Sequence, residues 1–400
     1  MKARREAATP RFARMLLMQA SGAGGDALVA LALAGSLFFS VPEADARGRV
    51  ALYLLVTMAP FSIVAPVLSG ALDRHPGGLR AAIVLSAAGR GVLAWLLATR
   101  LDTFLLFPIA FGVLVLSRAA LVAKGALLPM VVPEGRSLVE ANASLSKVTA
   151  LSGVIFGGMG IALVHWLSSH ADLLVATGVY LLGVLPSIGL PTQRRRSSTV
   201  PPIEARQKAR AVTVRQAVFA TGTLRLLVGF LVFHLGFAFR REDLTSLGLG
   251  VLIACAASGA LLGALLAPRL RRRLREEGII AVSLVIAGVS GIIAGRWFSL
   301  ATASALVFSF GIASGASKVA FDSIVQRDTP EGARGWAFAR FEAVLQLSWV
   351  AGAFVPVILS IPADTGVAAA GVLATAAALV YVLGRRSVAD RAALSVTPPR

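Results

Sequence analysis

The chain has 400 residues, of which 56% are hydrophobic and 15% are charged, and its formal net charge is +19. This number of polar side chains is too small to cover the surface of a soluble globular protein of this length. The composition therefore predicts a membrane protein. The basic residues are scattered at the ends of hydrophobic stretches, where they meet anionic lipid headgroups, and this distribution argues against nucleic-acid binding.

Twelve hydrophobic stretches follow one another along the chain. A bilayer core of about 30 Å requires roughly 20 apolar residues per helix, and each stretch is close to that length. In the first half we expect membrane helices at 16–39, 50–72, 81–99, 104–127, 144–167 and 173–190. In the second half we expect them at 224–239, 247–266, 279–294, 298–320, 341–361 and 367–383. The sequence therefore predicts an all-α polytopic membrane protein with twelve transmembrane helices.

A polar segment separates the two sets of six. Residues 191–216 contain proline and are strongly basic, so this segment cannot bury an apolar face in lipid. We interpret it as a cytoplasmic linker between an N-terminal six-helix bundle (1–190) and a C-terminal six-helix bundle with a cytoplasmic tail (217–400).

Basic residues are distributed unevenly over the gaps between the hydrophobic stretches. Twenty-seven of the 39 Lys and Arg residues fall in one alternating set of gaps and six in the other. This is the positive-inside pattern of a multi-pass protein of the cell membrane. It predicts that both termini lie in the cytoplasm.

The two halves also resemble each other. Val132-Pro133-Glu134-Gly135 follows the fourth stretch, and Thr329-Pro330-Glu331-Gly332 follows the tenth, 197 residues later. Gly70-Ala71-Leu72 and Gly263-Ala264-Leu265 repeat at a similar offset of 193. Matching motifs at matching places predict a duplicated six-helix unit with pseudo-symmetric halves.

A short motif after the second stretch resembles the major facilitator superfamily (MFS) of secondary transporters. The motif is Gly70-Ala71-Leu72-Asp73-Arg74. The family carries a glycine followed by Asp-Arg in the cytoplasmic loop between its second and third helices, and the resemblance extends over essentially the whole chain. It implies a conformational-gate loop formed by Gly70, Asp73 and Arg74.

Arg118 in the fourth stretch resembles the macrolide- and drug-efflux branch of that family. A glycine-rich fifth stretch matches the family's glycine spacing but lacks the proline typical of its antiporters, which counts against antiport. The glycines are Gly153, Gly157, Gly158 and Gly160. The resemblance implies a monomer that works by alternating access.

Asp26 is the strongest candidate for a functional charge. It lies ten residues into the first stretch, roughly 15 Å deep, on a side chain too short to reach the interface, so it must be neutral, paired or hydrated. Arg118 and Arg90 lie at matching depth, and either can pair with it. In the family, helices one and four line the central cavity, which favours Arg118. The pair either couples proton movement to alternating access or is permanently structural.

Other polar residues in the stretches receive less specific interpretations. His234 is a second candidate for a proton-responsive group, with a hydrogen-bonded core histidine as the alternative. Basic residues near the ends of their predicted stretches are interpreted as interfacial anchors whose stems reach the membrane surface. These are Lys124, Lys147, Arg225 and Lys318.

Motifs for other functions are missing from the sequence. It has no phosphate-binding loop, no HExxH or GxSxG motif, and a single cysteine, Cys255, so we expect no enzyme, no metal site and no cofactor. We therefore expect a secondary transporter for a small amphipathic molecule, with proton-coupled efflux ahead of uptake or facilitated diffusion. A non-transporting membrane receptor of the same fold is the alternative from a different class. The substrate, the direction of transport and the coupling ion stay open.

Overall fold

The computed structural model describes residues 10–37, 77–101, 103, 105–192, 212–241, 246–330 and 333–394. All regular structure in these residues is helical. The helices of the first half are α1 (Pro10–Leu37), α3 (Gly78–Thr99), α4 (Leu106–Leu127), the 3₁₀ turn η2 (Leu128–Met130), α5 (Leu138–Trp166), α6 (Ser169–Leu182) and α7 (Val184–Ile188). Those of the second half are α9 (Val212–Arg241), α10 (Ser246–Arg271), α11 (Glu276–Arg296), α12 (Leu300–Asp328), α13 (Arg334–Ile358) and α14 (Ala363–Leu394).

Eleven helices in these described ranges are long and apolar enough to cross a membrane. They correspond one to one with eleven of the twelve predicted stretches. The remaining stretch, 50–72, lies outside the described residues, as do the predicted gate residues Gly70, Asp73 and Arg74. The prediction of a multi-pass helical membrane protein is confirmed, and the prediction of a twelfth helix stays a prediction.

Several helices extend well beyond their apolar stretches. α9 begins at Val212, so residues 212–216 of the predicted linker are helical, while 193–211 lie outside the described residues. α12 ends at Asp328, two turns after the predicted end at Ala320. Hydropathy locates only the lipid-facing part of a helix, and hydrogen-bonded turns continue wherever polar side chains can meet other polar groups.

Local capping explains where several helices start. Ser137 and Glu140 form a reciprocal capping box at α5, and Ser299 and Thr302 form another at α12. Ser168 accepts a hydrogen bond from the Ala171 nitrogen at α6. Each side chain satisfies a backbone N–H group that the first turn of a helix leaves without a partner.

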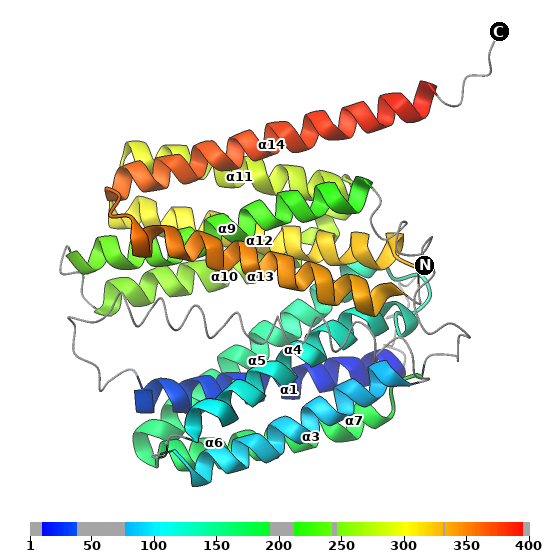
Figure 1. Cartoon of the computed structure of the whole chain (residues 1–400), viewed down its shortest axis with the longest axis vertical. Coiled ribbons are helices and arrows are strands. Elements are labelled where there is room, and N and C mark those ends of the chain that lie inside the picture. Colours follow the sequence, from blue (N-terminus) through cyan, green and yellow to red (C-terminus); the bar gives the residue numbers. More distant parts are fainter. Residues whose placement is uncertain are drawn as a thin grey trace, which may run out of the picture. The chain divides into compact units, whose positions relative to one another are not determined.

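The chain divides into two compact units, which we describe separately. The first contains α1 and α3 to α7 and also takes in residues 330–340, and the second contains α9 to α12, α14 and α13 from Phe341 onward (Figure 1). In the first unit α1 packs against α5 and α6, and α3 packs against α4 and α6. Helix α6 therefore joins the α1 and α3 sides of this unit.

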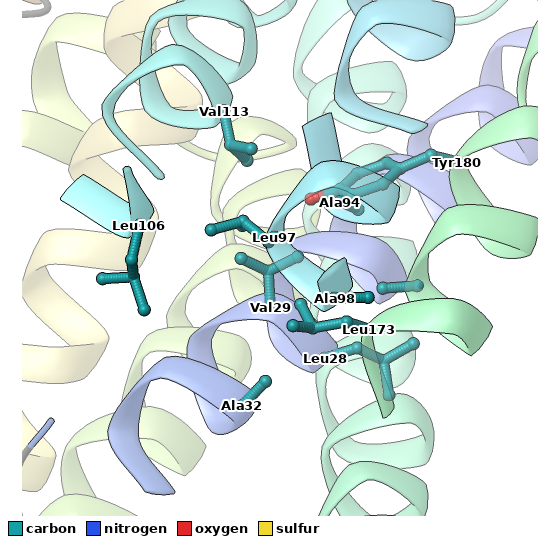
Figure 2. Packing of buried hydrophobic residues seen from close by; sticks show 11 residues of the cluster. Leu28, Val29, Ala32, Ala94, Leu97, Ala98, Leu106, Val113, Leu173 and Tyr180 are labelled. Carbon is teal, nitrogen blue, oxygen red and sulfur yellow. The ribbon is translucent and has the colours of Figure 1, made fainter. Parts of the chain in front are cut away.

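An apolar cluster fills the seam between α1, α3 and α6. Leu28 and Leu173 are completely buried in it, together with the Tyr180 ring. Figure 2 shows these side chains converging with Ala94 and Leu97 from α3. Close packing of this kind fixes the rotation of each helix, and with it the direction in which the polar residues point.

Glycines join the helices differently in the two units. In the first unit the space in front of a glycine usually holds a side chain, as where Phe156 lies against Gly24 and Leu116 against Gly89. In the second unit it often holds the backbone of the neighbouring helix. The second-unit glycines of this kind are Gly259 and Gly263 of α10, Gly311 and Gly315 of α12, Gly291 of α11 with Gly371 of α14, and Gly229 of α9 with Gly352 of α13.

Adding one methyl group to these seams tests this packing. A Cβ on Gly311 would lie 2.5 Å from the Ala256 carbonyl oxygen and 2.8 Å from the Ala260 nitrogen, both backbone atoms that cannot turn aside. Gly311→Ala should lower stability by about 1–3 kcal/mol, measured by thermal unfolding in detergent. The matched control is Gly236→Ala, because a Cβ there meets nothing within 4 Å and alanine favours the helix. Equal midpoints for the two variants would contradict the packing described here.

Candidate functional site

Asp26 lies at the centre of a polar cluster built by four helices of the first unit. Its Oδ1 atom accepts hydrogen bonds from Tyr180 Oη at 2.7 Å, Ser117 Oγ at 2.9 Å and Arg90 Nη1 at 3.1 Å. These donors belong to α6, α4 and α3, and Asp26 belongs to α1. We call Asp26, Arg90, Ser117 and Tyr180 the Asp26 cluster.

The four residues meet because they lie at similar distances from one end of their helices. Asp26 lies about three turns before the end of α1, and Arg90 lies about two and a half turns before the end of α3. Ser117 and Tyr180 each lie about three turns after the start of α4 and α6. With a pitch of about 5.4 Å per turn, these distances are roughly 14 to 17 Å, close to the middle of a bilayer.

The arginine of the cluster is buried while its aspartate is accessible. The Arg90 side chain is 5% exposed and that of Asp26 is 45% exposed. Arg90 also donates from Nε to the Ser86 carbonyl oxygen at 3.1 Å, and its guanidinium lies 4.7 Å from the centre of the Tyr180 ring. A cation as buried as Arg90 requires a counter-charge, and Asp26 supplies it.

Glycines on α1 make room for this arrangement. A Cβ at Gly25 would lie 2.6 Å from ring carbons of Tyr180, and a Cβ at Gly22 would lie 3.4 Å from Arg90 Nη2. Gly24 receives the Phe156 ring from α5. Gly24 and Gly25 thus let α5 and α6 bring aromatic rings against the α1 backbone, and the hydroxyl of one of these rings, Tyr180, reaches the Asp26 carboxylate.

The geometry leaves one carboxylate oxygen open. Within the described part of the chain, all three hydrogen bonds to this carboxylate end on Oδ1, and the side chain is nearly half exposed. Oδ2 can therefore exchange a proton with water or face a cationic group while Oδ1 stays held. The cluster combines a fixed cation, a titratable anion and two hydroxyl groups.

The pairing corrects the preference for Arg118. Asp26 pairs with Arg90 of α3, whereas Arg118 follows Ser117 on α4 and is half-buried. Ser117, the residue before Arg118, is the α4 side chain that donates to Asp26. Depth along the sequence could not choose between the two arginines, because both lie at the level of Asp26.

His234 lies in the second unit and is 3% exposed. Its Nε2 lies 3.1 Å from the Ala363 carbonyl oxygen, and its ring stacks on Phe230 at 4.8 Å. A Cβ on Gly366 would collide with the ring, so the histidine fills a small gap at the start of α14. These contacts are those of a hydrogen-bonded core histidine.

A second ionic cluster, in the second unit, was missed by the sequence interpretation. The Lys318 ammonium of α12 donates to Asp322 Oδ1 at 2.6 Å and also to Glu342 Oε1 of α13. The Arg225 charge on α9 is close enough to repel it. We call Lys318, Asp322 and Glu342 the Lys318 cluster.

The pairing of Lys318 with two carboxylates was not anticipated by its interpretation as an interfacial anchor, and the interpretation of Arg225 stays a prediction. Lys318 lies about three turns before the end of α12, and Arg225 lies about three and a half turns after the start of α9. Both helices extend beyond their apolar stretches, so the charges lie roughly 15 to 20 Å from the helix ends. The spacing of Lys318 and Asp322, four positions apart on one helix face, was the available signal.

Further charges join the ends of three helices in the second unit. Arg327 of α12 donates to Glu276 and Glu277 of α11 at 2.8 Å each, and it also pairs with Asp328. Arg271 of α10 pairs with Glu276 at 2.7 Å. These residues lie at helix ends, and their ion pairs hold the ends of α10, α11 and α12 together.

Comparison with solved structures shows the fold. The structure of a bacterial homologue of the iron transporter ferroportin superposes with a TM-score of 0.73 at 17% identity, covering 94% of this chain and 99% of that one. The human organic anion transporter MFSD10 superposes with a TM-score of 0.72 at 14% identity, covering 94% and 100%. The chain has the fold of the MFS transporters, and identities this low carry no information on the substrate.

The chain has sequence relatives in mycobacteria. An uncharacterized protein of Mycobacterium leprae (strain TN) is 30% identical over 370 residues, which are 82% of this chain and 63% of that protein. This chain thus spans less than two thirds of that relative's length. An uncharacterized MFS-type transporter of Mycobacterium tuberculosis (strain ATCC 25618 / H37Rv) is 26% identical over 384 residues, covering 85% and 83%. No family model matches the chain.

A double-mutant cycle tests the Asp26 pairing. Arg90→Met should destabilise the protein by about 1–3 kcal/mol, below the range for fully buried pairs because the aspartate is 45% exposed. Adding Asp26→Asn should recover part of that loss, as measured by unfolding in mixed micelles. The same cycle with Arg118→Met is the comparison, and equal coupling of Asp26 to both arginines would refute the assignment to Arg90.

Removing charges from the Lys318 cluster tests whether Lys318 stabilises the fold by balancing two carboxylates. Lys318→Met leaves two carboxylates facing each other in a buried place and should cost about 3 kcal/mol or more of stability. The triple change Lys318→Met, Asp322→Asn and Glu342→Gln leaves no carboxylates facing each other and should recover part of this loss, while the nearby Arg225 charge remains. Thermal unfolding of the wild type and these two variants gives the answer. A single change without effect would mean that the cluster is hydrated rather than buried.

Proposed function

We propose that this chain is a secondary active transporter that moves a small amphipathic molecule across the cell membrane by alternating access, and that it exports this molecule in exchange for protons. The fold supports the transport part of this proposal. The observation that carries the coupling part is the Asp26 cluster, in which a half-exposed carboxylate neutralises a buried guanidinium.

The coupling follows from the energies of the two protonation states. With Asp26 ionised, Arg90 is paired and the four helices α1, α3, α4 and α6 are held together. When Oδ2 takes a proton, Arg90 keeps its charge at 5% exposure without a counter-ion, and this arrangement is unfavourable by several kcal/mol. The helices then rearrange until the guanidinium meets water or another anion, such as an acidic substrate group. Each protonation state therefore favours a different arrangement.

The immediate surroundings of Asp26 support an amphipathic substrate. The carboxylate accepts a hydrogen bond from Tyr180, whose ring packs against Gly25, the residue before Asp26 on α1. A charged centre beside aromatic surface suits a molecule that is part ionic and part apolar. Phenylalanines of the hydrophobic stretches, among them Phe230 and Phe310, are buried in packing instead.

Export rests on the resemblance to the drug-efflux branch. The solved structures with this fold include an organic anion transporter and a homologue of an iron transporter, so the fold alone does not select the cargo. The remaining parts of the proposal are a monomer in the cell membrane with both termini in the cytoplasm, with no enzymatic activity. Uptake, facilitated diffusion and a non-transporting receptor are the competing functions.

Flux measurements in vesicles test the proposal. The purified full chain is reconstituted into liposomes with an imposed pH gradient, and a panel of fluorescent amphiphilic cations and anions is followed. Wild type should move at least one probe at a rate that depends on the gradient, and Asp26→Asn should reduce this rate by about tenfold or more. The isosteric amide keeps the shape of the side chain but cannot release a proton.

The matched control is Asp364→Asn, which makes the same chemical change at the exposed start of α14. It should transport like wild type. Gradient-driven flux that survives in Asp26→Asn would eliminate Asp26 as the coupling group. Flux that is independent of the gradient in wild type would favour facilitated diffusion, and the absence of flux with every probe would favour the receptor.

A further inference from the structure

One carboxyl group of the first unit is used by neither ionic cluster. Asp172 lies in the first turn of α6 and is completely buried, with an exposure of 0%. Among the described residues, neither Oδ1 nor Oδ2 has a hydrogen-bond partner, and no cation pairs with the group. A carboxyl group in this situation requires a physical explanation, because buried polar groups are almost always satisfied.

The surroundings of Asp172 are apolar and tightly packed. A Cβ on Gly160 of α5 would lie 3.2 Å from Asp172 Oδ1, 3.2 Å from a Leu28 methyl carbon and 2.8 Å from a Leu31 methyl carbon, both on α1. The carboxyl group is thus inserted where α1, α5 and α6 meet, directly against the bare backbone of Gly160. This spacing leaves no room for a water molecule between Asp172 and α5.

The titratable groups nearby do not compensate a negative charge. His170, two residues before Asp172 in the first turn of α6, has its Nδ1 atom 2.8 Å from the Ala98 carbonyl oxygen of α3. His165 of α5 lies against Trp166. On α1 the residues that meet Gly160 beside Asp172 are leucines, and Asp26 itself carries the same sign of charge as an ionised Asp172.

The free-energy costs of burying the two forms of Asp172 decide which form is present. The positive end of α6 can stabilise an ionised Asp172 by at most about 2 kcal/mol. Burying an unpaired carboxylate costs several kcal/mol, whereas a buried neutral carboxyl group that lacks hydrogen bonds costs only about 1–3 kcal/mol. In the packed arrangement of α1, α5 and α6, the neutral acid is the favoured form.

We propose that Asp172 is a second proton-binding site, protonated while α5 is packed against α1 and α6 at this end of the first unit, and ionised when they separate. Loss of the proton to entering water leaves a carboxylate that the closed seam cannot hold, so ionisation favours opening. Since the charge pattern predicts this end to face the outside, the outer pH would bias the seam. This inference goes beyond the proposed function, because protonation can be measured whether or not the chain transports.

Asp172 lies on the same helix as Tyr180 of the Asp26 cluster. Tyr180, which donates to Asp26, lies about two turns further along the same helix, roughly 12 Å away. Leu28 and Leu173 fill the seam near these residues, and Figure 2 shows both side chains in the cluster that also holds Tyr180. The two carboxyl groups are thus separated by apolar packing, and a proton can pass between them only if that packing opens.

Infrared spectroscopy tests the protonation directly. The full chain in lipid bilayers is labelled with ¹³C-aspartate, and the carbonyl stretch of neutral carboxylic acids is recorded as the pH is raised. Wild type should show an acid band at neutral pH that Asp172→Asn lacks, and this band should disappear in alkaline buffer. Asp364→Asn is the matched control and should keep the band. A wild-type spectrum without any band that Asp172→Asn removes would overturn the proposal.

Hydrogen exchange tests the link to opening. In alkaline buffer the amides of residues 156–166 and 169–176 should exchange about tenfold faster in wild type than in Asp172→Asn, which stays neutral at every pH. Comparing the two proteins at one pH removes the intrinsic pH dependence of exchange. Equal exchange would refute the link to opening even if the acid band is present.

A third variant separates a switch from a packing defect. Asp172→Leu replaces the unsatisfied carboxyl group with an apolar side chain, so it should raise the unfolding midpoint and show the slow exchange of Asp172→Asn at all pH values. A midpoint lowered in Asp172→Leu alone would report overpacking of this tight site. A midpoint lowered in both Asp172→Leu and Asp172→Asn would show that the Asp172 charge contributes to stability, and that result would contradict the neutral acid.

Discussion

The low polarity of the helix bundle around Arg90 is the constraint on which the Asp26 cluster depends. A guanidinium that is 5% exposed cannot remain charged without an anion nearby, and the anion that pairs with it stands on a different helix. That requirement draws α1 and α3 to a common point, and α4 and α6 add a hydroxyl group each. The same requirement makes the cluster sensitive to a proton, because neutralising Asp26 leaves the buried cation behind.

The two units neutralise their buried cations with different numbers of carboxylates. In the first unit one aspartate on α1 balances one arginine on α3, and the anion remains open to exchange. In the second unit Lys318 has two carboxylates, one on its own helix and one on α13, so the loss of one partner leaves the other in place. A single pair responds strongly to protonation, whereas the doubly paired lysine is better suited to hold α12 and α13 together.

The two units also differ in what their glycines contact. Glycines of the second unit bring backbones into direct contact, as at Gly311 and Gly263, and such seams cannot slide without clashes. Glycines of the first unit face side chains, as Gly24 faces Phe156, and side chains can change rotamer. The unit that carries Asp26 and Asp172 is therefore also the one whose helix contacts can adapt when a charge changes.

The sequence by itself determined the class of this protein. Hydropathy predicted the helices found in the described residues, since burial in lipid depends on the composition of each segment alone. Depth along a helix also marked Asp26 as a residue that needs a partner. The tertiary structure showed that Arg90 is a partner, because Arg90 and Arg118 share a depth in the sequence and only helix packing determines which cation reaches the carboxylate. It alone placed Lys318 far from a helix end and enclosed Asp172 among three helices, since packing between distant segments leaves no trace in local hydropathy.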